Sequence, residues 1–222
     1  MNTQTSPQKN VHFYTHCAEA EQAGFRPYKK CKPDQRDAAK GKHRAKAGEK
    51  IQFAIDDSSL GSVLVAQSDQ GLCAVLLGNN PYELKRDLQD RFPNATVTEE
   101  DSKCEKQLSE VIKFVEDPSC NLDVILDLRG TDFQQRVWKT LFEIPTGATA
   151  SYSDIAKKMG LPKAVRAVAK ACAANALAVI IPCHRVLRSD GTLSGYRWGV
   201  ERKKILLQRE KAGLREFSVL LD

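Results

Sequence analysis

Three short apolar runs separated by turn residues constrain the fold of this chain more than any other feature. They cover residues 51–55, 62–66 and 72–77, which is the length of ordinary β-strands. Turn residues separate them at Gly61 and at residues 69–71, and a further turn follows at residues 78–81. Runs of this length, bounded by glycine, asparagine and proline, are typical of hairpins. The sequence therefore predicts an antiparallel β-meander that begins at Ile51.

The chain after the meander predicts two helices and one more strand. Apolar residues recur at helical spacing in residues 81–92 and 105–115, which favours two amphipathic helices. The residues of their apolar faces are Leu84, Leu88, Phe92, Leu108, Ile112 and Val115. Residues 122–128 alternate and favour a strand. Because residues 49–130 contain no Ser/His/Asp or metal-spaced cluster, we interpret this α/β unit as a scaffold.

Helical patterns dominate the rest of the chain. The candidate helices cover residues 132–142, 151–159, 163–174 and 201–214. The second can be capped by Ser151 or Ser153, and Gly213 is expected to end the last. A short helix, a turn with glycine and a basic helix form a helix-turn-helix pattern, in which Arg166 and Lys170 share one face. An ordinary structural helix with a few basic residues is the alternative.

Charge is distributed unevenly along the chain. Residues 1–48 carry 10 Lys+Arg and 4 Asp+Glu, residues 49–130 carry 8 and 16, and residues 131–217 carry 16 and 7. Residues 33–50 have almost no large apolar side chain and are typical of a basic linker. A basic helical unit favours a polyanionic partner such as nucleic acid, although a solvated lysine-rich surface would have the same composition.

The composition also excludes several classes of protein. No apolar run approaches the ~20 residues that span a membrane, and the N-terminus has no apolar core of a secretory signal. The seven cysteines are odd in number, irregularly spaced and without a C-x-x-C pair. They favour reduced thiols over a disulfide framework or a zinc site. The expected location is intracellular, in the cytoplasm, or in the nucleus if the source is eukaryotic.

One short motif carries reactive groups. Cys183 stands directly before His184 and Arg185, just after the apolar residues 177–181. A thiol attacks only as its thiolate, and a neighbouring base or cation can generate one. The alternative is that Cys183 is a small core residue, since free cysteines are often buried. The loop 187–199 that follows has three glycines and two aromatic residues, which either approach a ligand closely or cover the core edge.

The motifs taken together resemble one family. The chain is similar to the O6-alkylguanine-DNA alkyltransferases (methylated-DNA–protein-cysteine methyltransferases), most closely to the C-terminal half of bacterial Ada-type proteins. The resemblance runs from about Lys50 to about Lys211. It is carried by Phe133-Gln134, Val137-Trp138, Ser151-Tyr152, residues 162–168, Ala174-Asn175, residues 182–186 and residues 195–199.

The resemblance implies a fold and an activity. It implies a small α/β (α+β) domain of ribonuclease-H-like topology at residues 49–130. A mostly helical, winged-helix-like DNA-binding domain with a helix-turn-helix would follow at residues 131–217. The implied reaction transfers the alkyl group of O6-methylguanine, and more weakly of O4-methylthymine, irreversibly to Cys183. The implied partner is double-stranded DNA that contains O6-alkylguanine, the protein is expected to be a monomer, and no cofactor is implied.

The resemblance also implies a role for each site residue. In the implied mechanism His184 takes the proton of Cys183 through a water, and Glu210 holds the imidazole. Asn175 would connect the helix-turn-helix to the site, and Tyr152 would crowd the 3′ phosphate and help to rotate the nucleotide. The remaining implied residues are Arg166, Lys163 and Lys170 for DNA binding, with Arg166 filling the gap left by the flipped base, and Tyr196, Arg197, Trp198 and Lys203 for the base pocket.

The N-terminal residues depart from the family pattern. Residues 10–14 and 23–34 resemble the tail of the Ada-type zinc domain, which binds zinc through four cysteines. Tyr28 stands at one ligand position, Cys31 matches another, and the first pair has no counterpart. One thiolate does not make a tetrahedral site. We therefore interpret residues 1–48 as a degenerate remnant without zinc; a site built on His12, His16 or Cys17 is the alternative. The activator-type helix-turn-helix that usually follows also has no counterpart, so a transcriptional switch is not expected.

Two other classes of function compete with repair. A DNA-binding or regulatory module would recognise damage without chemistry, and a cysteine hydrolase would turn over an ester or amide many times. Both share the basic helix or the thiol with the repair hypothesis. They differ from it in whether Cys183 accepts an alkyl group once. A single, irreversible transfer is the predicted function.

Overall fold

A four-stranded sheet forms the first part of the molecule. The protein is known from a computed structural model that describes residues 48–99 and 103–219. The strands are β1 (Lys50–Ser58), β2 (Gly61–Ser68), β3 (Gly71–Gly78) and β4 (Thr96–Glu99), in the order β3-β2-β1-β4. β1, β2 and β3 form the predicted antiparallel meander, and β4 lies parallel to β1. β4 escaped prediction because its four residues are mostly exposed at the edge of the sheet.

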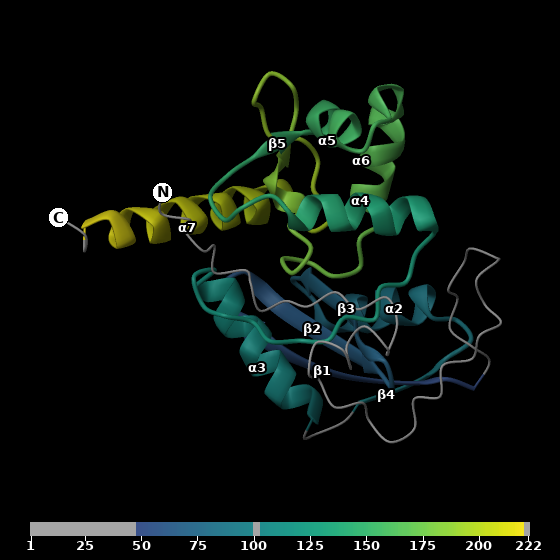
Figure 1. Cartoon of the computed structure of the whole chain (residues 1–222). Coiled ribbons are helices and arrows are strands. Elements are labelled where there is room, and N and C mark those ends of the chain that lie inside the picture. Colours follow the sequence, from purple (N-terminus) through teal and green to yellow (C-terminus); the bar gives the residue numbers. More distant parts are fainter. Residues whose placement is uncertain (1–47, 100–102, 220–222) are drawn as a thin grey trace, which may run out of the picture.

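Two helices cover opposite faces of this sheet. α2 (Pro81–Arg91) packs on the face that carries Leu64 and Leu76, and α3 (Lys103–Glu116) packs on the face that carries Val63 and Val65 (Figure 1). The alternation of strand side chains between two faces explains this division, because successive residues point to opposite sides. Both predicted helices are confirmed. We call residues 48–116 the sheet part.

The predicted strand at residues 122–128 is wrong. These residues do alternate, and Leu122, Val124 and Leu126 are buried. They contact the sheet through one parallel bridge, in which Leu72 donates to the Ile125 carbonyl at 2.9 Å and Asp127 donates to the Leu72 carbonyl at 2.9 Å. The alternation therefore reflects a burial pattern along the edge of β3 rather than a strand of its own.

Helices and short turns form the second part, residues 132–219, which we call the helical part. The elements are α4 (Asp132–Phe142), β5 (Ala150–Ser151), α5 (Tyr152–Lys158), η2 (Pro162–Ala164), α6 (Val165–Ala173), η3 (Cys183–Arg185), β6 (Val186–Leu187) and α7 (Val200–Val219). Capping boxes start two of them: Thr131 caps α4 and pairs with Gln134 in its first turn, and Ser151 caps α5 and pairs with Asp154 in its first turn.

Two helix boundaries differ from the prediction. The basic helix α6 begins at Val165 rather than at residue 163, because Pro162 opens a 3₁₀ turn first. The last helix continues past Gly213 to Val219. A glycine inside a helix costs only about 1 kcal/mol, which does not end a long helix by itself.

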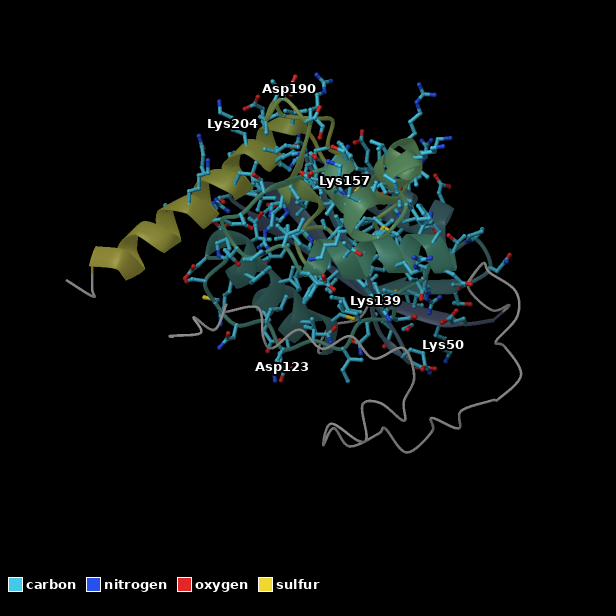
Figure 2. The ribbon with its side chains drawn as sticks, turned by 45° about the horizontal axis from the view of Figure 1, so that its top comes forward. Lys50, Asp123, Lys139, Lys157, Asp190 and Lys204 are labelled. Carbon is cyan, nitrogen blue, oxygen red and sulfur yellow. The ribbon has the colours of Figure 1, made fainter. Side chains whose placement is uncertain are left out.

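A continuous core joins the two parts. The larger core cluster includes α3, one face of the sheet, α4, α6 and the residues around Cys183. α4 lies between the sheet and the pair α5 and α6, and α7 extends away from the body (Figure 1). Trp138 of α4 donates from Nε1 to the Ala171 carbonyl of α6 at 2.8 Å. In Figure 2, Lys157 and Lys204 mark the helical part, at the opposite end of the molecule from Lys50 and Asp123. No described helix is long and apolar enough to cross a membrane.

Candidate active site

The backbone before Cys183 is held by the sheet and folded tightly. Val75 of β3 donates to the Ala176 carbonyl at 2.8 Å, and Ala178 donates to the Val75 carbonyl at 2.9 Å. Val179 has a φ of 66° and is the centre of a turn in which Ile180 donates to the Ala178 carbonyl at 2.6 Å. A β-branched residue in this γ-turn stores strain on the order of 1–3 kcal/mol. The fold imposes this strain directly upstream of the thiol.

Asn175 fixes the strained segment and the thiol together. Its side chain is fully buried, and its Oδ1 accepts from the Leu177 amide at 2.8 Å. Its Nδ2 donates to the carbonyls of Leu177 and Ile181, both at 3.2 Å, and to Cys183 Sγ at 3.3 Å. One amide therefore links the end of α6 to the sulfur, which is the connection expected of Asn175.

Cys183 is a buried thiol at the start of η3. Its side chain is 5% exposed. Burial raises the pKa of Cys183 to about 11, although the Asn175 hydrogen bond and the Lys203 charge act in the opposite direction. At neutral pH the resting group is therefore the protonated thiol. The thiol needs a base before it can attack.

The structure brings His184 and Glu210 together. His184 Nε2 lies 2.7 Å from Glu210 Oε1, and both side chains are buried. Burial alone would raise the pKa of Glu210, but hydrogen bonds and charge from His184 and Arg185 lower it to about 2. An ionised carboxylate only accepts hydrogen bonds, so His184 donates through Nε2. In the neutral ring Nδ1 is then the basic nitrogen.

Arg185 contacts the carboxylate rather than the thiol. Its Nε lies 3.0 and 3.1 Å from the two oxygens of Glu210, and its Nη2 lies 2.8 Å from Oε1. Nη1 donates to the Ile144 carbonyl at 2.5 Å, and the Gly147 amide donates to Glu210 Oε2 at 3.1 Å. From the sequence, the Arg185 guanidinium was one of the groups that could activate Cys183. In the structure it instead supplies positive charge that helps to keep Glu210 ionised.

His184 is a buried imidazole that is neutral at neutral pH. Burial lowers its pKa below 6.5, which the hydrogen bond to Glu210 only partly offsets. Because the Arg185 guanidinium already balances the charge of Glu210, the site does not require a protonated imidazole. Among the described residues, His184 Nδ1 is buried without a hydrogen-bond partner. Such a free acceptor is what a proton-transfer step requires.

The loop after Cys183 supplies the predicted pocket residues. The Tyr196 ring lies edge-on to His184, with centroids 6.5 Å apart, and edge-on to Trp198, with centroids 5.2 Å apart. Within the described chain, Tyr196 Oη and Trp198 Nε1 are buried without a hydrogen-bond partner. Tyr196 is half-buried and Trp198 is 5% exposed. These aromatic rings form one wall beside the His184 imidazole.

Lys203 and Tyr152 meet at a residue that sequence reasoning missed. Fully buried Lys203 donates from Nζ to the Val186 carbonyl at 2.5 Å and to Ser194 Oγ at 2.8 Å. Tyr152 Oη lies 2.8 Å from the same Ser194 Oγ. Burial lowers the pKa of Lys203 to about 8. A lone serine between glycines carries no signal in the sequence, so only the fold reveals this contact.

Four of the predicted residues are exposed rather than buried beside the thiol. Arg197 stands between Tyr196 and Trp198 in the loop, but its side chain forms an ion pair with Asp87 of α2 at 2.8 Å. The three predicted DNA-binding residues Lys163, Arg166 and Lys170 are exposed on η2 and α6. Their positions are compatible with contacts to a large polyanion. The predicted remnant at residues 1–48 lies, except for Gly48, outside the described residues.

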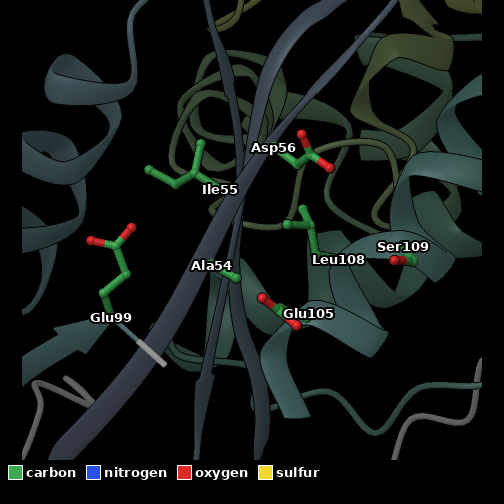
Figure 3. A pocket seen from close by; sticks show the side chains of 7 residues that line it. All are labelled: Ala54, Ile55, Asp56, Glu99, Glu105, Leu108 and Ser109. Carbon is green, nitrogen blue, oxygen red and sulfur yellow. The ribbon is translucent and has the colours of Figure 1, made fainter. Parts of the chain in front are cut away.

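A cavity on the sheet part is separate from this site. It has a volume of about 450 Å³ and lies between β1 and α3 (Figure 3). Its lining includes the carboxylates of Asp56, Glu99 and Glu105. None of the predicted site residues lines it, and an acidic cavity of this kind repels a nucleic acid.

Comparison with known proteins decides the family. The model "6-O-methylguanine DNA methyltransferase, DNA binding domain" matches residues 132–212, and "Metal binding domain of Ada" matches residues 2–34. The inducible methylated-DNA–protein-cysteine methyltransferase of Bacillus subtilis is 42% identical over 156 residues, covering 70% of this chain and 87% of that protein.

The chain belongs to the methylated-DNA–protein-cysteine methyltransferase family.

Solved members of this family have the same α/β fold. The O6-methylguanine methyltransferase of Mycobacterium tuberculosis superimposes with a TM-score of 0.62 at 37% identity, covering 73% of this chain and 93% of that one. A DNA complex of the M. tuberculosis protein gives 0.61 at 35% identity with the same coverage. The bifunctional Ada protein of Escherichia coli is 52% identical over 160 residues, but the chain spans only 45% of its length. The resemblance drawn from the motifs is thereby confirmed.

Proposed function

We propose that this methyltransferase repairs DNA by moving the alkyl group of O6-methylguanine to Cys183, once per molecule. The observation that carries the proposal is the buried thiol beside the His184–Glu210 pair, held in place by Asn175. This is the order nucleophile, base and orienting group. The relatives of similar length are named as methylated-DNA–protein-cysteine methyltransferases, which supports the same reaction here.

The reaction follows from the geometry of these groups. His184 Nδ1 takes the Cys183 proton through a water while Glu210 and Arg185 hold the ring. The sulfur attacks the alkyl carbon, so that an S–C bond forms as the bond from carbon to O6 breaks. The electron pair leaves with guanine, and the proton released by the thiol balances its charge. The thioether product has no route back to a thiol, which makes the protein single-use.

We propose that the DNA is double-stranded and that the damaged base leaves the stack. The O6 carbon is inaccessible in a duplex, and extrusion costs a few kcal/mol. Exposed Arg166 fills the gap from the minor groove, while Lys163 and Lys170 contact phosphates. Tyr152 crowds the 3′ phosphate. O4-methylthymine is a weaker substrate. The crystallised M. tuberculosis complex with DNA supports this partner.

The base then occupies a pocket beside Cys183. Tyr196, Trp198 and Lys203 would form it, which is supported by the contact between the two rings and by the hydrogen bond of Lys203 to the Val186 carbonyl. Arg197 was predicted to line the same pocket, but its side chain pairs with Asp87 of α2.

We propose a finer description of the fold as well. Residues 49–130 form a ribonuclease-H-like domain, supported by the strand order β3-β2-β1-β4 with β4 parallel to β1. Residues 131–217 form a winged-helix-like domain with a helix-turn-helix at α5 and α6. Residues 1–48 remain a degenerate remnant without zinc, because Tyr28 replaces a thiolate. Zinc bound stoichiometrically to the purified protein would contradict the last point.

We also propose an intracellular monomer. Cys73, Cys120, Cys172 and Cys183 are free thiols, which fits a reducing compartment.

Transfer of radiolabel from methylated DNA tests the proposed function. The label should move to the protein up to one equivalent, and Cys183→Ala should abolish it. Label that stays on DNA would favour the second candidate, a damage-binding or regulatory protein, which the exposed basic face of α6 supports. More than one equivalent turned over on an ester or amide would favour a hydrolase instead.

A further inference from the structure

Arg202 joins three segments that are far apart in the sequence. Its Nε donates to the Leu60 carbonyl at 2.6 Å, in the turn between β1 and β2. Its Nη1 donates to the Trp198 carbonyl at 2.8 Å, and its Nη2 donates to Asn79 Oδ1 in the turn before α2. The fixed fork of a guanidinium suits such a three-way contact. Arg202 thus ties the pocket loop to two turns of the sheet part.

The turns leave space for this guanidinium. Gly61 has a φ of 92°, and a Cβ at that position would lie 3.0 Å from Arg202 Nη2 and 2.5 Å from the Gly78 carbonyl oxygen. Only glycine is compatible with that conformation and that proximity. The β1–β2 turn therefore has the shape that the Arg202 contact requires.

Trp198, which accepts one of these hydrogen bonds, is connected to His184 through a row of aromatic rings. The indole of Trp198 packs edge-on against Tyr196, which packs edge-on against His184. The described hydrogen bonds of Arg202 do not reach Cys183 or His184. Its hydrogen bond to the Trp198 carbonyl connects it to this row of rings.

We propose that Arg202 is a positioning residue that sets the size of the alkyl pocket by fixing Trp198 to the sheet part. This inference rests on the proposed function, because it concerns the adducts that Cys183 accepts. A hydrogen bond from a charged donor is stronger than a neutral one, so its loss frees the Trp198 backbone. A freed Trp198 can yield to a large adduct, whereas a methyl group needs no such movement.

Arg209 provides a matched control on the same helix. It lies seven residues after Arg202, and therefore on the same face of α7. It donates to the Val115 carbonyl at 2.6 Å and forms an ion pair with Glu116 at 3.1 Å, so it also ties α7 to the sheet part. Its described hydrogen bonds and ion pair go to Val115, Ser59 and Glu116 and do not include the pocket loop. Arg209→Met thus removes a similar tie without releasing Trp198.

The test compares two adducts in single-turnover reactions. Duplexes with O6-methylguanine or O6-benzylguanine are mixed with the full-length wild type, Arg202→Met and Arg209→Met, and the two transfer rates are measured. Arg202→Met should raise the benzyl-to-methyl rate ratio at least fivefold, and Arg209→Met should leave it within twofold of wild type. Methionine keeps the apolar stem, so that the change reports the guanidinium.

Two results would overturn the inference. One is an equal loss of the benzyl and methyl transfer rates in Arg202→Met, and the other is the same benzyl-to-methyl rate ratio in Arg202→Met and Arg209→Met. If Arg202→Met does not fold, Arg202→Lys replaces it: a smaller rise supports the inference, and an unchanged ratio overturns it. A wild type that transfers neither adduct would remove the proposed function itself, which distinguishes the two failures.

Discussion

Replacing Glu210 by glutamine removes the charge at the centre of the site without changing its shape. The carboxylate accepts from the Nε2 of His184, the Nε and Nη2 of Arg185 and the amide of Gly147. All four partners are donors, and a glutamine NH₂ would have to face at least one of them. Arg185, which is 1% exposed, would also lose its counter-ion. Breaking one side of a buried ion pair costs about 3–5 kcal/mol.

The lowered pKa of Glu210 gives a second figure for the stabilisation that these contacts provide. The folded protein lowers this pKa from 4.5 to about 2, which corresponds to roughly 3.4 kcal/mol of stability at neutral pH. Because the folded pKa is depressed, the stabilisation is fully present above pH 4.5 and is lost as the pH falls towards 2. At pH 3, where the carboxyl is still ionised in the folded protein, about 1.4 kcal/mol should remain. The Glu210→Gln variant lacks this pH-dependent contribution.

Urea unfolding of wild type and Glu210→Gln measures the effect directly. The difference in the free energy of unfolding should be about 3 kcal/mol at pH 7 and should shrink by roughly 2 kcal/mol at pH 3, since the other carboxyl groups cancel between the two proteins. The transfer rate at pH 7 should fall at least tenfold, because His184 loses the partner that selects its tautomer. A difference below 1 kcal/mol at pH 7, or one that does not change with pH, would refute the reasoning.

Three further changes probe other parts of the site. Asn175→Ala should lower the free energy of unfolding by about 2–3 kcal/mol in urea, since it leaves the Leu177 amide unpaired in the core. Asn175→Asp keeps that acceptor but turns an acceptor-only group towards the Leu177 and Ile181 carbonyls, so it should destabilise the protein at least as much as alanine does, and a smaller loss would contradict the donor role of Nδ2. Trp198→Gly should raise transfer of benzyl relative to methyl adducts in a competition assay, and an unchanged preference would contradict a tight pocket. Arg166→Ala should slow transfer from duplex DNA about tenfold or more but leave transfer from the free O6-methylguanine base unchanged; equal slowing of both would exclude a role in base extrusion.

Local patterns in the sequence identified most of the fold. The meander was predictable because its strands are short apolar runs and its turns contain glycine and asparagine, and both features act locally. Residues 122–128 were wrongly predicted as a strand, because burial along a sheet edge produces the same alternation as pairing in a ladder. β4 has only four residues, and its pairing with β1 depends on where α2 returns the chain. Long-range placement, rather than local preference, decides such elements.

In the candidate site, too, local motifs were predictable from the sequence and long-range contacts were not. Cys183, His184 and Glu210 were identified from motifs, and the structure places His184 and Glu210 2.7 Å apart. The direction of Arg185 was not predictable, since adjacency in the sequence does not fix where a side chain points in a 3₁₀ turn. Contacts through Ser194 and Arg202 depend on backbone carbonyls, which every residue has and no sequence pattern marks.

The two hydrogen bonds between Val75 and residues 176 and 178 have a consequence for how long the molecule remains active. They make the edge of the sheet the support of the strained turn that precedes Cys183. The sheet and the nucleophile thus belong to one cooperative unit, although they lie in different parts of the chain. Under the proposed single-use reaction, each molecule stays active until it is either alkylated or unfolded. Because the sheet edge supports the turn before Cys183, unfolding of the sheet would also remove the geometry of the nucleophile.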